Sequence, residues 1–97
     1  MCLSYLLGLL ADAHANAGHH AEAMKVVEEG IALGIATGER FYIAELYRLQ
    51  GELYAHPAVG QKQKAEESLR LAINIAKQQR AAALEHKANE SLRRCLA

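Results

Sequence analysis

The sequence predicts an all-α fold made of antiparallel helix-turn-helix repeats, and three observations support that prediction. Apolar residues recur every three or four positions through most of the chain, which is the spacing of one helix face. The chain also matches itself when it is shifted by 40 positions, and a period between 20 and 50 residues is typical of repeat proteins. Single glycines, and the one proline, stand where the periodic stretches are expected to end.

The stretch Gly38–Tyr54 is the centre of the self-match. Upstream, the matched pairs are Leu6 with Leu46, Leu9 with Leu49 and Ala11 with Gly51. Downstream, the matched pairs are Arg40 with Arg80, Glu45 with Glu85 and Gly51 with Ser91. The stretch is therefore expected to be an internal copy with a related helix on each side.

The first two helices are expected over residues 3–17 and 20–37. The apolar stripe of the first consists of Leu3, Leu6, Leu7, Leu10 and His14. The stripe of the second consists of Ala23, Val27, Ile31 and Ile35. Gly18 and Gly38 follow these stretches, where glycine stops a helix in the left-handed conformation.

The third and fourth helices are expected over residues 40–55 and 62–79. His56-Pro57 closes the third, because the residue before proline is disfavoured in helical geometry. The predicted buried side of the fourth helix consists of Ala65, Leu69, Ala72, Ile73 and Ala76. Small residues at Ala23, Gly51, Ala65 and Ala72 predict close approach between paired helices.

A fifth helix is expected over residues 81–96, with a thin stripe of Leu84, Ala88 and Leu92. Only Gln78-Gln79-Arg80 separates it from the fourth, without glycine or proline. Helix propensity alone would let the two helices fuse, and that alternative stays open. The self-match favours a break near Arg80.

Composition limits the functions that this chain can have. Its 97 residues predict one small domain, and 11 basic against 11 acidic residues predict no global attraction to nucleic acid or to an anionic membrane. The charge is uneven, since residues 51–97 hold eight bases and five acids. No apolar run approaches the roughly 18 residues of a membrane span. Cys2 and Cys95 lack CxxC spacing, which predicts reduced thiols and a cytoplasmic protein.

No motif of known catalytic chemistry is present in the sequence. There is no glycine-rich phosphate loop and no nucleophile-elbow serine, and the histidines lack metal-ligand spacing. We therefore predict no enzyme, no metal and no cofactor. The basic residues of the second half are interleaved with acids and lack stacking aromatics, so nucleic-acid binding is the less favoured class.

The spacing within the repeats resembles the tetratricopeptide repeat, whose pattern is W-x2-L-G-x2-Y followed by A-x3-F. The first copy consists of Leu7, Leu10, Ala11, His14, Ala23, Val27 and Gly30. The second consists of Tyr47, Gln50, Gly51, Tyr54, Ala65, Leu69 and Ala72. The resemblance implies about two and a half units that form a short right-handed α-solenoid. The second unit departs from the first by two extra residues in its turn, because Ala11 to Ala23 is 12 positions and Gly51 to Ala65 is 14.

The strings around Gly38–Tyr54 and Ala65–Glu85 also resemble the C-terminal helical repeats of large bacterial signalling proteins. In those proteins a nucleotide cyclase or DNA-binding module and an ATPase module precede the repeats. The resemblance implies either the tail of such a protein or a stand-alone relative of one. The catalytic modules themselves have no counterpart in these residues.

In the tetratricopeptide family the first helix of each pair lines a concave groove that binds a peptide or a helix. The resemblance places there Tyr5, Asp12, Asn16, Glu45, Arg48, Glu52, Glu85 and Asn89. From charge sign, this set predicts an acidic groove that suits a basic or polar peptide, or a helix of a neighbouring domain.

We therefore expect a non-catalytic protein–protein interaction module. The alternative is a regulatory C-terminal region of a bacterial cyclase or ATPase signalling protein. Repeat arrays need capped ends, so we also expect the open helical ends to self-associate, most simply as a two-fold dimer.

Overall fold

A computed structural model describes residues 10, 18–38, 42–57 and 59–97. Within these ranges the chain forms four α-helices and no strands, which confirms the all-α prediction for this part. The helices are α2 (His20–Thr37), α3 (Ile43–Ala55), α4 (Lys62–Gln78) and α5 (Ala82–Leu96). The helix expected over residues 3–17 lies outside the described residues, apart from Leu10. None of the described helices is long and apolar enough to cross a bilayer.

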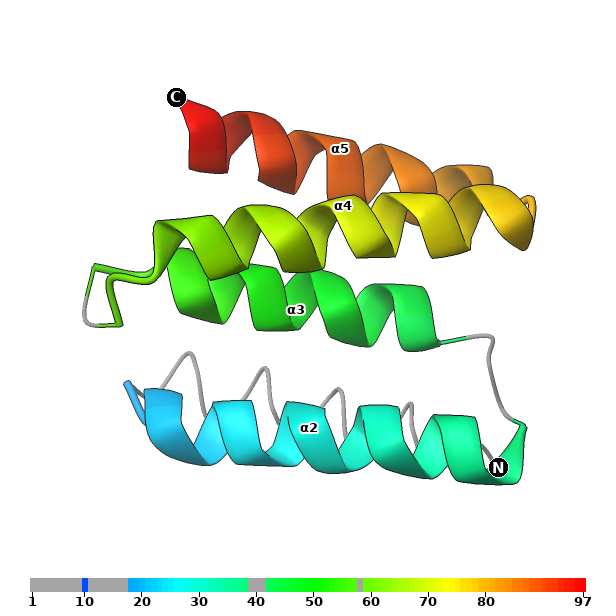
Figure 1. The fold of residues 1–97 in the computed structure, drawn as a ribbon, viewed down its shortest axis with the longest axis horizontal. Helices are drawn as coiled ribbons and strands as arrows, with labels where there is room; N and C mark the ends of the chain where they lie inside the picture. Colours follow the sequence, from blue (N-terminus) through cyan, green and yellow to red (C-terminus); the bar gives the residue numbers. More distant parts are fainter. Residues whose placement is uncertain (1–9, 11–17, 39–41, 58) are drawn as a thin grey trace.

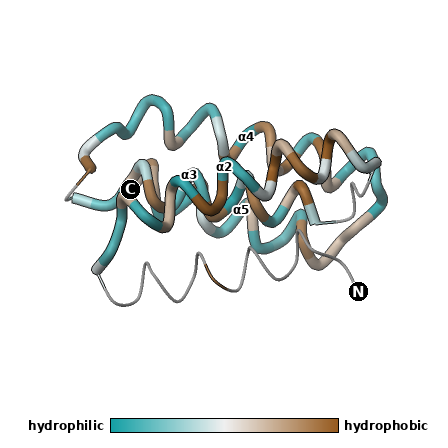
Figure 2. Tube along the Cα trace, turned by 90° about the horizontal axis from the view of Figure 1, so that it is seen from below, coloured by the Kyte–Doolittle hydropathy of each residue, from teal (hydrophilic) through white to brown (hydrophobic). Residues whose placement is uncertain are grey.

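The helices follow one another up and down, with α3 at the centre (Figure 1). α3 packs against α2, α4 and α5, and α4 also packs against α5. α2 contacts neither α4 nor α5, so each helix meets only its near neighbours in the chain. Hydrophobic and hydrophilic residues alternate along each helix, as expected where each helix buries one side (Figure 2).

Two apolar clusters hold these helices together. The cluster between α2 and α3 consists of Ala23, Val27, Ile31, Leu46 and Leu53. The cluster among α3, α4 and α5 consists of Ala65, Leu69, Ala72, Ile73, Ala88, Leu92 and Cys95, with Tyr47 and Tyr54 against it. All five residues predicted for the buried side of α4 are buried.

Two residues of the predicted apolar stripes are exposed, Leu10 at 46% and Ile35 at 52%. The buried positions of α2 are Ala23, Val27, Gly30, Ile31 and Gly34. Steps of four residues turn a helix by about 40° more than a full turn, so a strict four-residue series drifts off the core face. Gly34 therefore takes the buried place that the series assigned to Ile35.

The ends of α2 and α3 have the backbone geometry that the sequence predicts, and the end of α4 has a motif that was not predicted. Gly38 ends α2 with φ 77°, and His56 before the proline is extended, with ψ 137°. Between α4 and α5, Arg80 is left-handed at φ 55°. Ala81 N donates to Ala76 O and Arg80 N donates to Lys77 O, which together make a Schellman motif without glycine. The break near Arg80 is therefore present.

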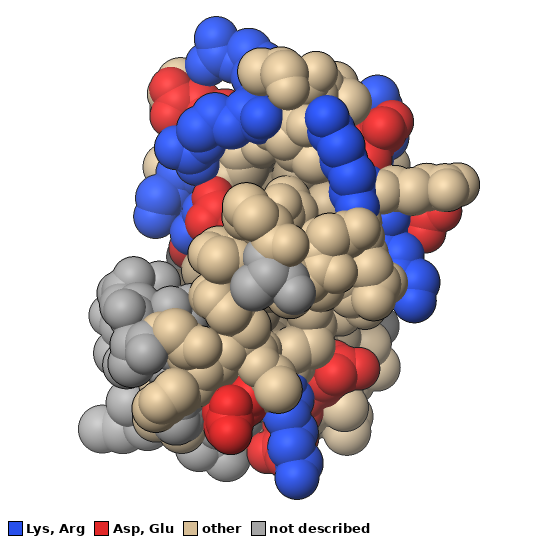
Figure 3. All heavy atoms as spheres, turned by 90° about the vertical axis from the view of Figure 1, so that its left-hand side faces the viewer, with Lys and Arg blue, Asp and Glu red and all other residues tan. Residues whose placement is uncertain are grey.

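Charge is distributed unevenly over the molecule. At the end that holds the C-terminus, basic side chains gather around the upper part, where α4 and α5 lie (Figure 3). This agrees with the excess of bases in residues 51–97.

Candidate partner-binding face

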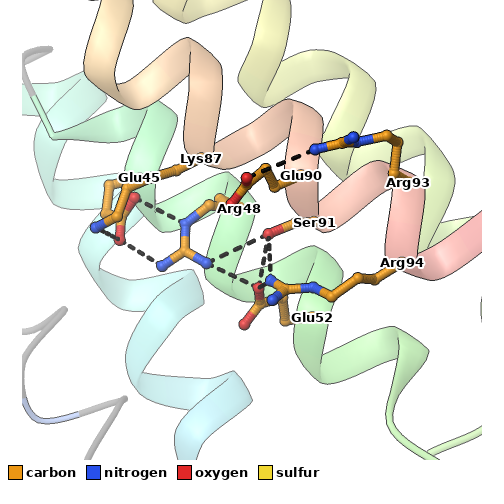
Figure 4. A network of polar contacts seen from close by, with 8 residues as sticks. All are labelled: Glu45, Arg48, Glu52, Lys87, Glu90, Ser91, Arg93 and Arg94. Atoms are coloured by element: carbon orange, nitrogen blue, oxygen red, sulfur yellow. Dashed lines mark hydrogen bonds and ion pairs between the residues drawn. The ribbon is translucent and has the colours of Figure 1, made fainter.

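Three polar side chains of α3 lie on the side that faces α5. Glu45, Arg48 and Glu52 follow at spacings of three and four residues, which puts them on one stripe of the helix. Leu46 and Leu53 point into the cluster with α2 on another side of α3. The polar stripe is therefore free of the apolar core and meets polar residues of α5 (Figure 4).

Arg48 is the centre of this polar network, and only 13% of its side chain is exposed. Its Nε and Nη2 atoms donate to the two carboxylate oxygens of Glu45 at 2.9 and 2.6 Å, which is a bidentate pair. Its Nη1 atom donates to Glu52 Oε2 at 2.8 Å. One guanidinium therefore holds two carboxylates of its own helix.

Residues of α5 complete the network. Glu52 Oε2 also accepts from Ser91 Oγ at 2.6 Å and from Arg94 Nη2 at 3.0 Å. Lys87 Nζ lies 3.8 Å from Glu45 Oε2. Ser91 is buried, whereas Lys87 and Arg94 are exposed, so the contacts run from the core edge to solvent. We call the six residues of this network the α3/α5 face: Glu45, Arg48, Glu52, Lys87, Ser91 and Arg94.

The two halves of the α3/α5 face have opposite charge at equivalent positions. The buried positions of α2 recur in α4 at a spacing of 42: Ala23 with Ala65, Val27 with Leu69, Gly30 with Ala72, Ile31 with Ile73 and Gly34 with Ala76. The same spacing relates Glu45 to Lys87 and Glu52 to Arg94, which are the residues paired between the helices. Opposite charges at equivalent positions attract, so they favour the packing of α5 on α3.

The prediction of an acidic groove rests on eight residues, of which Tyr5, Asp12 and Asn16 lie outside the described ones, and among the described residues the charge of this side differs from that prediction. Both carboxylates of α3 are paired, and the α3/α5 face holds three cations, Arg48, Lys87 and Arg94, against two acids. The exposed Arg93 also lies on α5 and pairs with Glu90 at 3.5 Å. Because Lys87 and Arg94 come from another helix, the net charge of this side depends on how α5 docks.

The eight predicted groove residues fall into three groups. Glu45, Arg48 and Glu52 come together in the network. Tyr5, Asp12 and Asn16 lie outside the described residues. Glu85 and Asn89 take no part in the network as described, and the Asn89 amide donates to the Glu85 backbone carbonyl at 3.1 Å. At 100° per residue, Asn89 is nearly half a turn around α5 from Lys87.

Sequence reasoning missed Lys87, Ser91 and Arg94 as members of one face. The information that locates them is the longer turn of the second unit, with 14 positions from Gly51 to Ala65 against 12 in the first. These two extra residues change the spacing from 40 to 42 for everything that follows. Adding two to the predicted Glu85 gives Lys87.

Other candidate chemistry is limited in the described part. Among the residues that the structure describes, no three His, Cys, Asp or Glu side chains are grouped to hold a metal ion. His20 at the start of α2 contacts His56 after α3, with ring centroids 4.0 Å apart. This contact joins the ends of two helices at the same edge of the molecule.

Comparison with known proteins finds a likeness to a much longer protein. The chain matches no protein-family model. It matches no solved structure either. It is similar to an uncharacterized protein of Rhizobium meliloti, with 39% identity over 77 residues. That region is 79% of this chain but 7% of the relative, so the relative is more than ten times as long as the region in common.

Proposed function

We propose that this chain is a non-catalytic protein–protein interaction module that binds a peptide or helix on the α3/α5 face. The observation that carries the proposal is the network of Arg48 and Glu52 with Ser91 and Arg94 between two helices. It presents fixed donors and acceptors on a surface. Such a surface suits an extended polar partner, because polar contacts at an interface set orientation and specificity.

The repeat spacing supports a tetratricopeptide-like right-handed α-solenoid as the architecture. Small or branched residues occupy equivalent buried positions 42 apart, and contacts join only near neighbours in the chain. In a solenoid each repeat touches only the next one, and the first helices of successive repeats form one continuous binding surface. α3 and α5 are those helices in this proposal.

The charge of the α3/α5 face favours an acidic or polar partner over a basic one. Glu45 and Glu52 already have cationic neighbours, whereas Lys87 and Arg94 are 57% and 71% exposed. A partner carboxylate can reach these two cations without breaking the bidentate pair of Arg48.

The outer face of α5, at one end of the proposed array, affects whether two copies of the chain can pair there. The outward positions of α5 include His86, Glu90 and Arg93, all exposed and charged or polar. A polar outer face is what caps a repeat array, so α5 does not favour a two-fold dimer through this side. A homodimer would use another surface.

A second candidate function is regulation inside a much longer protein. The observation that favours it is the length of the Rhizobium meliloti relative, of which the similar region is 7%. In that case the partner of the α3/α5 face is another domain of the same polypeptide. A large bacterial signalling protein is the class that we propose.

Capture of partners by matched variants tests the main proposal. Wild type, Lys87→Glu and Lys25→Glu are immobilised and exposed to a lysate of the source organism, with circular dichroism to check folding. Lys25 is an exposed lysine of α2, so it controls for charge change alone. We expect a protein captured by wild type and by Lys25→Glu that Lys87→Glu retains at less than about a tenth. Equal capture by all three variants contradicts the proposal.

The identity of the captured protein separates the two candidates. A separate gene product supports a stand-alone module. A domain encoded by the same gene as this chain supports the regulatory candidate.

A further inference from the structure

A surface hollow lies at one end of the α3/α5 face, where α3 ends, α4 begins and α5 ends. Its volume is about 580 Å³. The side chains around it are Glu52, Ala55, His56, Pro57, Lys62, Leu69, Ser91, Arg94 and Cys95. Figure 3 looks at this end and shows blue cationic side chains around a recessed uncharged surface. The hollow therefore combines an apolar floor with a cationic edge.

The floor is made by residues of three helices. Leu69 and Cys95 are buried core residues, and Ala55 is half-buried in the last turn of α3. Because alanine is short, it leaves space between the end of α3 and the end of α5. An apolar side chain of a partner that enters this space would be removed from water on several sides.

The edge has a net positive charge. Lys62 and Arg94 line the hollow and are exposed. Glu52 is the one carboxylate among the lining residues, and its Oε2 already accepts from Arg48, Ser91 and Arg94. Within the described ranges Lys62 has no ion pair. One helix N-terminus and two C-termini meet here, and their dipoles oppose one another, so the side chains decide the sign.

We infer that this hollow binds an acidic polypeptide segment, with one large apolar side chain in the hollow and flanking carboxylates on Lys62 and Arg94. This inference rests on the proposed function and names the partner's chemistry. A polypeptide is favoured over a small molecule because the hollow is open to solvent. Small ligands bind where a pocket buries most of their surface, whereas a peptide continues over the edge onto the α3/α5 face.

Fluorescence anisotropy with defined peptides tests the inference on the full chain. The probe is a fluorescein-labelled peptide in which one leucine stands between two pairs of glutamates. Matched peptides replace the glutamates by glutamines, the glutamates by lysines, or the leucine by serine. We expect the acidic leucine peptide to bind at low salt, and each matched peptide to bind at least about tenfold more weakly.

Protein variants then locate the bound peptide. Lys62→Glu should weaken binding of the acidic leucine peptide by about tenfold or more, while Lys25→Glu, the same charge change on α2, leaves it unchanged. Ala55→Leu fills the hollow without a change of charge and should weaken binding by a similar factor, and its folding is checked by circular dichroism. Added salt should weaken binding to wild type, because exposed charges are screened.

Four outcomes overturn the inference. They are no binding of the acidic leucine peptide, equal binding of the glutamine peptide, no effect of Lys62→Glu and Ala55→Leu, and displacement of the peptide by 4-methylpentanoate at the peptide's own concentration. The last outcome would assign the hollow to a small carboxylate. Loss of partner capture in Lys87→Glu alongside any of these results leaves the proposed function intact, so the two failures are distinguishable.

Discussion

The contacts that α3 makes with α4 differ in kind from those that it makes with α5. Toward α4, Gly51 of α3 lies directly against the fully buried Leu69 and against the Ala65 backbone. Toward α5, Arg48 and Glu52 meet Ser91 and Arg94 through hydrogen bonds and ion pairs. The first interface is mostly close-packed and apolar, with one hydrogen bond from Ser68 Oγ to Gln50 Oε1 at 3.0 Å, and the second keeps a network of polar groups at its surface.

This difference separates the part of the molecule that provides stability from the part suited to binding. Close-packed apolar contacts depend on volume, and a change of one methyl group alters them. Ion pairs near a surface contribute little net free energy, because desolvation and side-chain ordering offset the attraction. A partner can therefore exchange polar contacts with the α3/α5 face at small cost, whereas the α3–α4 pair must stay intact.

The largest loss of stability is expected from a substitution at the centre of the α3–α4 interface. Leu69→Ala removes a fully buried side chain, and we expect the free energy of unfolding to fall by about 2–5 kcal/mol. Leu71→Ala is the matched control on the same helix, because Leu71 is 41% exposed and should cost less than about 1 kcal/mol. Urea denaturation measures both, and equal losses would contradict the assignment of the core.

The second effect tests the close approach of the two helices. A Cβ on Gly51 would lie 2.5 Å from Leu69 Cγ and 3.1 Å from the Ala65 carbonyl oxygen. Gly51→Ala should therefore destabilise by about 1–3 kcal/mol, although alanine is the better helix former. In a Leu69→Ala background most of this cost should vanish, because the two Leu69 side-chain atoms nearest the added Cβ are gone and only the 3.1 Å contact with the Ala65 carbonyl oxygen remains. Additive losses in the double variant would refute the contact.

The third effect concerns the polar interface. Arg48→Met leaves the half-buried Glu45 and Glu52 without their shared guanidinium, which we expect to cost about 1–2 kcal/mol in thermal or urea unfolding. Arg70→Met breaks the exposed pair with Glu66 and should cost no more than about 0.5 kcal/mol. If the two variants melt alike, the network adds nothing to the docking of α5.

The smallest effect on stability is expected at the turn between α4 and α5, which sets how α5 packs against α3 and α4. Arg80 adopts a left-handed conformation that glycine enters without steric cost, so Arg80→Gly should stabilise by up to about 1 kcal/mol. The neighbouring Gln79 is helical at φ −84°, and Gln79→Gly should destabilise instead. A destabilising Arg80→Gly would argue against the Schellman motif.

The amino-acid sequence determined the features that depend on local periodicity. The buried side of α4, the bounds of α2 and the extended His56 before Pro57 all follow from helical spacing and backbone sterics. These preferences act within a few residues, so a linear pattern contains them. The break at Arg80 also came from the sequence, through the match of the chain with itself at a shift of 40 positions.

Only the tertiary structure decided the rotation of α5 and hence the composition of the candidate site. Glu45, Arg48 and Glu52 of α3 were predicted for the groove, but from α5 the sequence offered Glu85 and Asn89, whereas Lys87 and Arg94 are the residues that pair with α3. Two extra residues between α3 and α4 change the repeat spacing, and a two-residue change turns a helix by about 200°. The face that α5 turns toward α3 is therefore set by packing against residues some 40 positions away, which no local pattern records.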